Sequence, residues 1–160
     1  KKSGMLQFTM GTVGLEDPMD KRYFYALNSD GKMVAFIVFV PFLGKNGYME
    51  IDSLLVNGNT KIVCNKSILF GKNCLISWGG YIMDTDFHHI YYNSKIINGD
   101  EDIVVGNNVW ICMNCIVLKG THIPNNSVIG AGSTITKKLE EENALYVNNK
   151  VVKRNIEWRM

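Results

Sequence analysis

The segment VGNNVWICMNCIVLKGTHIPNNSVIGAGSTIT, residues 105–136, divides into units of six residues. Each unit begins with a β-branched aliphatic residue, and these are Val105, Ile111, Val117, Ile123, Ile129 and Ile135. The fifth positions hold small or medium side chains, namely Val109, Cys115, Thr121, Ser127 and Ser133. A period of six matches neither the two-residue period of a strand nor the 3.6-residue period of a helix. It indicates a solenoid in which a short strand and a corner repeat.

The period also predicts where each side chain of a unit lies. The aliphatic residue points inward and stacks on its counterparts in neighbouring coils, and the fifth residue is small because it faces the interior beside a corner. Asn and Gly occupy the corners, as in GNN at 106–108 and PNN at 124–126. These residues tolerate the left-handed backbone angles that sharp corners need. Cys115 falls on a small interior position, so we expect it to be a packing residue.

An earlier stretch, residues 64–87, keeps the period less regularly. Its units begin at Cys64, Phe70, Ile76 and Ile82, and Cys74 and Gly80 hold small fifth places. The two halves are out of phase, because residues 82 and 105 are 23 positions apart, which is not a multiple of six. A segment of about residues 84–104 must therefore leave the solenoid, and DTDFHHI, residues 84–90, opens it. Loops that project from a rigid solenoid commonly carry function.

Composition indicates an ordinary globular domain. The chain has 160 residues, of which 46% are hydrophobic and 20% charged, with a formal net charge of +2. This length is enough for one domain with a core, and so small a charge does not argue for a nucleic-acid partner. The longest apolar run, residues 33–43, is shorter than the roughly 20 residues that a membrane-spanning helix needs. We therefore expect a buried strand there and no membrane span.

The chain has four cysteines, Cys64, Cys74, Cys112 and Cys115. Only one C-x-x-C pair is present, whereas two such pairs would be typical of a zinc site. We expect the four to be small buried thiols in a reducing compartment. The first fifteen residues also lack the sustained apolar segment of a signal peptide. Together these features predict a cytoplasmic protein without a bound metal.

Residues 60–158 resemble the hexapeptide-repeat acyltransferases. The matching segments are VWI at 109–111, IVLKG at 116–120, IPNNSVIGAGS at 123–133 and TK at 136–137. DTDFHHI followed by a loop and then this repeat is similar to the acetyltransferase branch, which includes sugar and xenobiotic acetyltransferases. The resemblance implies an all-β fold, a left-handed parallel β-helix with three six-residue faces per coil. It also implies acetyl-CoA as cosubstrate and a homotrimer with active sites between neighbouring subunits.

The expected reaction is transfer of an acetyl group to a hydroxyl or amine of a sugar or a similar small polar acceptor. This reaction needs a base, and a neutral imidazole with a reference pKa of about 6.5 suits that role. By resemblance His88 is the catalytic histidine, with His89 as the alternative. His89 stands where many members have Pro and is otherwise expected to contact the acceptor. Asp86 is expected to orient the imidazole and Asp84 to contact the acceptor. For either aspartate, capping of a turn is an equal alternative.

The resemblance also implies a path for the cofactor. Ala131 and Gly132 would lie along the pantetheine arm, Thr136 and Lys137 match a Thr-Lys pair of the family near the cofactor, and Lys150 and Lys153 would bind its phosphates. Met113 is also expected to contact the cofactor. Many members have a Gly-Gly pair where this chain has Cys112 and Met113, so a catalytically impaired structural or binding solenoid is the alternative function.

A second alternative is the γ-type carbonic anhydrase, which shares this fold and binds zinc through three histidines. This chain has three histidines, at positions 88, 89 and 122. Adjacent residues of an extended segment point to opposite sides, so His88 and His89 are poorly placed to bind one ion. We expect His122 to lie on the surface.

Residues 1–56 show no repeat, and we expect them to form an N-terminal hairpin or cap segment before a hexapeptide-repeat domain over residues 57–160. RYFYALNSDGKMVAFIVFVPF, residues 22–42, reads as strand, turn and strand with NSDG as the turn. Residues of about 10–50 resemble a fragment of the aminoacyl-transferring domain of lysyl-phosphatidylglycerol synthases. A fragment of that domain would lack its activity, and solenoids need caps over their open ends.

Overall fold

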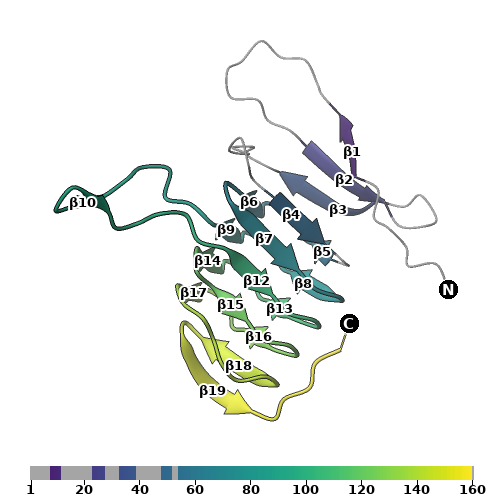
Figure 1. The fold of residues 1–160 in the computed structure, drawn as a ribbon. Helices are drawn as coiled ribbons and strands as arrows, with labels where there is room; N and C mark the ends of the chain where they lie inside the picture. The colour runs from purple at the N-terminus through teal and green to yellow at the C-terminus, as the bar shows by residue number, and fades with distance from the viewer. Residues whose placement is uncertain (1–7, 12–22, 28–32, 39–47, 52–53, 160) are drawn as a thin grey trace.

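The structure is a computed structural model that describes residues 8–11, 23–27, 33–38, 48–51 and 54–159. Its centre is a left-handed parallel β-helix, in which the chain winds through three parallel sheets (Figure 1). The first sheet contains β4 (Tyr48–Ile51), β7 (Ser67–Phe70), β12 (Ile103–Val105) and β15 (His122–Ile123). The second contains β5 (Leu54–Val56), β8 (Cys74–Ile76), β13 (Trp110–Ile111), β16 (Val128–Ile129), β18 (Ala144–Val147) and the antiparallel β19 (Lys150–Arg154). The third contains β6 (Lys61–Val63), β9 (Tyr81–Met83), β14 (Ile116–Leu118) and β17 (Thr134–Ile135).

The interior of the solenoid is filled by the first and fifth positions of the repeat. The six first-position residues from Val105 to Ile135 are at most 2% exposed. First-position residues of successive coils stack in three ladders, one for each sheet. In the second sheet the ladder contains Ile76, Ile111 and Ile129. The fifth positions are also buried, so the inward pattern predicted from the period is confirmed. Burying each such side chain contributes about 1.5–3 kcal/mol, and the regular stacking fixes the register of the coils.

The corners follow the fourth position of the units. Positive φ angles occur at that position in Asn73, Gly79, Asn108, Asn114, Gly120, Asn126 and Gly132. The prediction that Asn and Gly form the corners is therefore confirmed. Gly79 has a φ of 73°, and a Cβ atom there would lie 2.3 Å from Asn114 Oδ1, so a larger residue would need the left-handed backbone angle and a shift of the Asn114 amide.

The segment between β9 and β12 leaves the solenoid, as predicted, and projects from its side (Figure 1). Within it β10 (Tyr91–Tyr92) and β11 (Lys95–Ile96) form a short antiparallel hairpin. We call residues 84–102 the arm. The coil resumes at Ile103, directly beneath β7, with which β12 pairs. The arm is thus an insertion at the corner between the third and first sheets.

An antiparallel sheet of three strands stands at the N-terminal end of the solenoid (Figure 1). It consists of β1 (Phe8–Gly11), β2 (Tyr23–Leu27) and β3 (Met33–Val38), and β3 contacts β5 and β6 of the first coil. The predicted hairpin is confirmed as β2 and β3, whereas β1 was not expected, because FTMG lacks a clear alternating pattern. The expected NSDG turn lies outside the described residues. In the described part of the chain we find no helix long and apolar enough to cross a bilayer.

Candidate active site

Asp84 lies at the base of the arm, directly after β9. Its side chain is fully buried, and its carboxylate accepts hydrogen bonds from three main-chain amides. Asn65 N lies 2.6 Å from Oδ1, and Lys66 N and Ser67 N each lie 2.8 Å from Oδ2. These amides belong to the turn between β6 and β7, one coil earlier in the chain. The geometry therefore matches the turn-capping role that the sequence allows for Asp84.

A strained turn precedes His88. Phe87 has a φ of 62°, and His88 N donates a 2.7 Å hydrogen bond to Asp86 O across it. The hydroxyl of Thr85 accepts a second bond of 3.0 Å from Phe87 N. A positive φ at a bulky residue costs about 1–3 kcal/mol and persists only where the surroundings hold it. The result is an exposed His88 side chain at the start of the arm.

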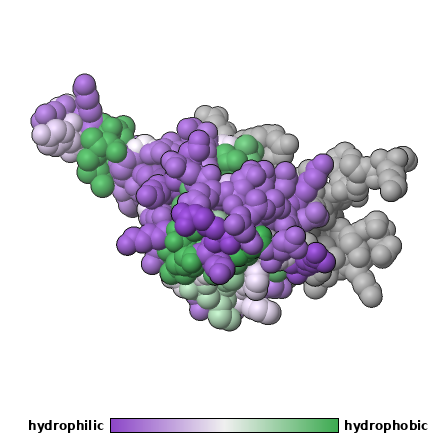
Figure 2. Space-filling view, turned by 90° about the horizontal axis from the view of Figure 1, so that it is seen from below, coloured by the Kyte–Doolittle hydropathy of each residue, from purple (hydrophilic) through white to green (hydrophobic). Residues whose placement is uncertain are grey.

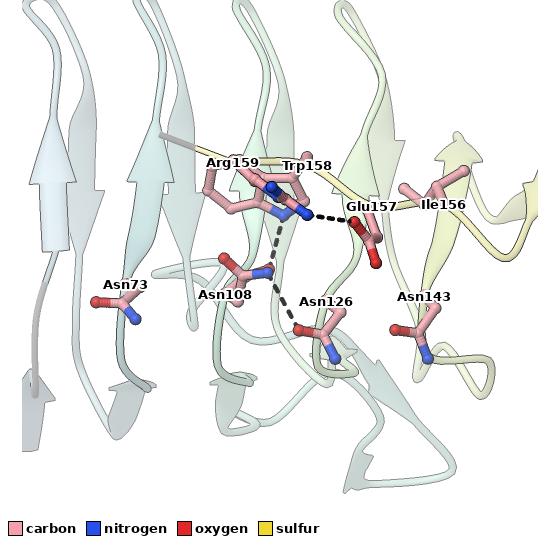
Figure 3. A pocket seen from close by; sticks show the side chains of 8 residues that line it. All are labelled: Asn73, Asn108, Asn126, Asn143, Ile156, Glu157, Trp158 and Arg159. Atoms are coloured by element: carbon pink, nitrogen blue, oxygen red, sulfur yellow. Dashed lines mark hydrogen bonds and ion pairs between the residues drawn. The ribbon is translucent and has the colours of Figure 1, made fainter.

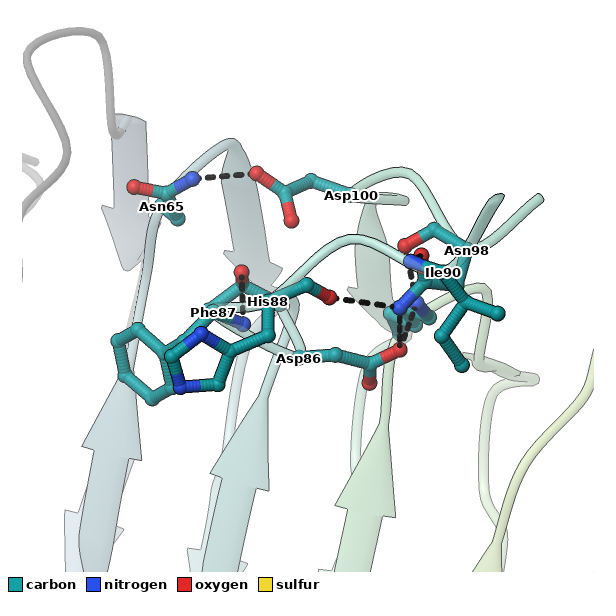
Figure 4. Close-up of polar contacts among 9 residues, drawn as sticks. Asn65, Asp86, Phe87, His88, Ile90, Asn98 and Asp100 are labelled. Carbon is teal, nitrogen blue, oxygen red and sulfur yellow. Dashed lines mark hydrogen bonds and ion pairs between the residues drawn. The ribbon is translucent and has the colours of Figure 1, made fainter. Parts of the chain in front are cut away.

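The Asp86 carboxylate turns toward the arm and the next coil. It forms an ion pair with Lys119 Nζ and accepts a 2.9 Å hydrogen bond from Asn98 Nδ2. Figure 4 shows this carboxylate beside Asn98, whereas the His88 ring lies on the other side of the segment. The hydrogen bond from Lys119 lowers the pKa of Asp86. Within the described ranges we find no hydrogen bond between Asp86 and an imidazole, so any effect on His88 must pass through the main chain.

The other two histidines lie elsewhere. The His89 side chain is exposed and packs edge-on against Tyr91, with ring centroids 6.4 Å apart. His122 occupies β15 and is half-buried at the rim of a depression of about 490 Å³, which Lys138 and Glu140 also line. No group of three His, Cys, Asp or Glu side chains that could hold a metal ion occurs among the residues described.

The predicted cofactor residues form two groups. Met113, Ala131 and Gly132 are exposed at the corner that precedes the strands of the third sheet, where Gly132 N donates a 2.9 Å hydrogen bond to Met113 O. Thr136 and Lys137 follow β17 at the opposite end of that sheet. β17 connects the two groups, so the chain from Gly132 to Thr136 runs straight from one to the other.

Two of the predicted cofactor-binding lysines lie at a depression near the C-terminal end of the solenoid. Lys137 and Lys150 line this depression of about 480 Å³ together with Arg154 and Glu141. Arg154 Nε and Nη2 donate to the Glu141 carboxylate at 2.5 and 2.8 Å, and this bond lowers the pKa of Glu141. Arg154 is therefore already paired. Lys153 is exposed on β19 opposite Leu145 and does not line the depression.

His88 and the first cofactor group lie at opposite edges of the third sheet. His88 follows the carboxyl end of β9, whereas Met113 and Ala131 precede the amino ends of β14 and β17. A strand of three residues spans about 10 Å. Within a single chain, Thr136 and Lys137 therefore lie at the same edge of the third sheet as His88. The first cofactor group, which is Met113, Ala131 and Gly132, lies at the opposite edge.

A further depression, of about 550 Å³, runs along the corner between the first and second sheets. Asn73, Asn108, Asn126 and Asn143 line it in successive coils, and the C-terminal segment 156–159 crosses it (Figure 3). Trp158 Nε1 donates a 2.8 Å hydrogen bond to Asn108 O, and the Trp158 ring lies 5.8 Å from that of Trp110. The tail thus covers part of the outer face of the second sheet.

All four cysteines lie in the described solenoid, and none of them forms a disulfide there. Cys64, Cys74 and Cys115 are buried, as predicted, whereas Cys112, which follows β13, is only half-buried and packs against the core. Burial raises the pKa of Cys112 to about 11, with a further contribution from Cys115, and burial also raises the pKa of Cys115. Both groups are therefore thiols at neutral pH, which suits packing residues.

Two residues of the site, Lys119 and Asn98, were not expected from the sequence. Lys119 belongs to the segment IVLKG, and Asn98 lies within the arm. Nothing in the local sequence distinguishes Asn98 from other polar loop residues. For Lys119 the sequence carries one signal, its position directly after a core strand, and the structure buries this side chain to 15% exposure, where a charged group needs a partner.

Comparisons with known proteins agree with this architecture. A model of the family described as bacterial transferase hexapeptide (six repeats) matches residues 102–137. The solved structure of the polysialic acid O-acetyltransferase OatWY is 36% identical, with a TM-score of 0.61 over 68% of this chain and 56% of that one. The polySia specific acetyltransferase NeuO is 24% identical, with a TM-score of 0.55 over 79% of this chain and 64% of that one, and supports the fold alone.

The chain thus spans less than two thirds of the length of these two relatives. A maltose O-acetyltransferase from Clostridium difficile 630 is 24% identical, with a TM-score of 0.44 over 75% of this chain and 71% of that one. No curated protein sequence matches the chain. The six-residue units and the match over residues 102–137 show that this part of the chain carries the bacterial transferase hexapeptide repeat.

Proposed function

We propose that this chain is an acetyl-CoA-dependent O- or N-acetyltransferase that acts on a sugar or a similar small polar acceptor. The observation that carries the proposal is the exposed His88 at the edge of the hexapeptide coil, in a chain 36% identical to a polysialic acid O-acetyltransferase. That similarity favours a sugar acceptor and transfer to oxygen. Acetyl transfer would take place at the corner at which the arm leaves the solenoid.

His88 acts as the general base in this proposal. Its neutral imidazole accepts the proton of the acceptor hydroxyl or amine as that atom attacks the thioester carbonyl. The carbon–sulfur bond then breaks, and coenzyme A leaves as a thiolate that takes up the proton. His89 is the proposed contact for the acceptor. Asp84 is buried, so it serves the acceptor indirectly, by holding the base of the arm.

The cofactor path is proposed along the third sheet. Met113, Ala131 and Gly132 would line the pantetheine arm, and a Cβ atom on Gly132 would meet no atom within 4 Å, so the surface there is open. Thr136 lies beside the exposed Lys137, and Lys150 and Lys153 supply further cations for the phosphates. These cations lie near the C-terminal end of the solenoid.

A homotrimer with active sites between subunits would complete this site. The predicted base and the first cofactor group lie at opposite edges of one sheet, and a neighbouring copy can bring them together. The arm also exposes large apolar side chains, which are Phe87, Ile90, Tyr91, Tyr92, Ile96 and Ile97, each 44–67% exposed. Figure 2 shows apolar surface on the projecting arm. Such a surface is typical of a protein interface, and we expect a solution mass of three times 18.1 kDa.

The direct test is release of free coenzyme A from acetyl-CoA in the presence of candidate acceptors. The panel contains sialic acid oligomers, maltose and neutral monosaccharides, and products are identified by mass spectrometry. Acceptor-dependent release with an acetylated product is the expected result. An absence of coenzyme A binding at millimolar concentration would contradict the proposal.

The second candidate is a binding solenoid that keeps the fold without catalysis. Cys112 and Met113 stand where many relatives have two glycines, and the Met113 side chain is 46% exposed at the proposed cofactor path. If that side chain blocks the thioester, the chain will bind an acceptor saccharide without acetylating it. Met113→Gly would then restore coenzyme A binding, and this separates the two candidates.

A further inference from the structure

The side chain of Asn98 holds three residues around the predicted base. Its Nδ2 donates to Asp86 Oδ2 at 2.9 Å and to His88 O at 2.8 Å, and its Oδ1 accepts from Ile90 N at 2.6 Å. Asn98 lies on the returning half of the arm, so these bonds close the arm upon itself. One amide therefore fixes the path of the main chain from residue 86 to residue 90 (Figure 4).

Lys119 ties this closed segment to the solenoid. It follows β14 in the next coil, and its Nζ donates to the Asp86 carboxylate and, at 2.7 Å, to Asn98 O. Both partners belong to the arm, whereas the backbone of Lys119 belongs to the rigid stack. The position of the segment is thus set relative to the third sheet.

The main chain of His88 is held on both sides, and its ring is not. His88 N bonds to Asp86 O and His88 O accepts from Asn98. No hydrogen bond from the imidazole itself is found in the part of the chain that the structure describes. A catalytic histidine needs a fixed position, and here the available constraint is the backbone.

We propose that Lys119, Asn98 and Asp86 form a clamp that positions His88 for proton transfer. This inference rests on the proposed role of His88 as the base. The clamp also holds the strained turn at Phe87, which without it would relax to an ordinary backbone angle and move the imidazole. None of the three side chains touches the reacting atoms, so they are positioning residues.

The clamp differs from an ordinary surface ion pair. The Lys119 side chain is 15% exposed and makes two bonds, although its partner Asp86 is 44% exposed. In the pair of Lys66 and Asp102, at 3.1 Å, both side chains are about half exposed, at 51% and 47%. Exposed pairs of the latter kind contribute little, because water and salt screen them. Lys66 and Asp102 therefore provide a matched control beside the same arm.

The test compares Lys119→Met and Asn98→Leu with Lys66→Met in the full chain. We expect the first two to lower kcat by about 10²-fold, because a displacement of 1 Å has an effect of that size. The KM for acetyl-CoA should stay within about twofold, since no proposed cofactor residue contacts the clamp. Lys119→Arg should recover most of kcat, and Lys66→Met should match the wild type. A matched Tm for all variants shows that the fold is intact.

Two outcomes would overturn the clamp. One is a kcat for Lys119→Met within about twofold of wild type while His88→Ala is inactive. The other is unchanged hydrogen exchange at the amides of His88 and Ile90 in Lys119→Met, since we expect faster exchange there than in Lys66→Met. The exchange measurement does not depend on activity. If His88→Ala keeps its full rate, the proposed function fails, and the exchange result alone still decides whether the clamp exists.

Discussion

Replacing His88 by alanine is expected to lower kcat for acetyl transfer by about 10²- to 10⁴-fold, the usual cost of losing a general base. The side chain is exposed, so the free energy of unfolding should stay within about 0.5 kcal/mol of wild type. The KM for acetyl-CoA should change little, because the base acts on the acceptor. Steady-state rates at saturating acetyl-CoA, with Tm measured in parallel, test this prediction.

The pH profile separates a lost base from a distorted site. In the wild type, kcat/KM should depend on pH as general-base catalysis requires, and this dependence should disappear in His88→Ala. Asp86 does not contribute to the profile. Its pKa is lowered, so the ion pair with Lys119 is present above the ordinary carboxyl value of about 3.9 and is lost only below it.

Two variants control for the choice of histidine. His122→Ala changes a half-buried residue of β15 that has no place in the proposed site, and we expect the wild-type rate. If His89→Ala abolishes the rate and His88→Ala does not, the base has been assigned to the wrong member of the pair. If neither His88→Ala nor His89→Ala changes the rate, the proposal of a histidine base is wrong.

The solenoid was predictable because its determinants repeat along the sequence. Ile111 is recognisable as a core residue only because Ile76 and Ile129 occupy the same place in adjacent coils. The corner residues repeat in the same way, as with Asn108 and Asn126. The phase break likewise predicted the arm, since a segment that leaves the coil shifts a fixed period.

The clamp was not predictable, because no period links its members. Asp86 and Lys119 are 33 residues apart, and Asp86 and Asn98 are 12 apart. Whether their side chains meet depends on how the arm folds back, which in turn depends on the positive φ of Phe87. The contact between the C-terminal segment and the solenoid was unpredictable for the same reason. Nothing in the sequence links Trp158 with Asn108, which is 50 residues away.

Replacing Asp84 by asparagine is expected to destabilise the fold by about 3–5 kcal/mol. Its side chain is fully buried, and its carboxylate accepts hydrogen bonds from three main-chain N–H groups. An amide side chain offers one acceptor oxygen and turns a donor toward the remaining N–H groups. Each charge-assisted bond contributes about 1.5–3 kcal/mol, and a buried unsatisfied donor costs about 1–3 kcal/mol. Thermal and urea unfolding at equal protein concentration would measure the loss.

Asp102→Asn is the control, because this half-exposed carboxylate pairs only at the surface, with Lys66, and surface pairs contribute about 0–1 kcal/mol. The comparison also decides between the two roles that the sequence allows for Asp84. A turn cap requires that Asp84→Asn lose stability and activity together, since the base of the arm then moves. A stable Asp84→Asn variant with a raised KM for the acceptor would instead mean that the carboxylate binds the acceptor, and that the arm must open to expose it.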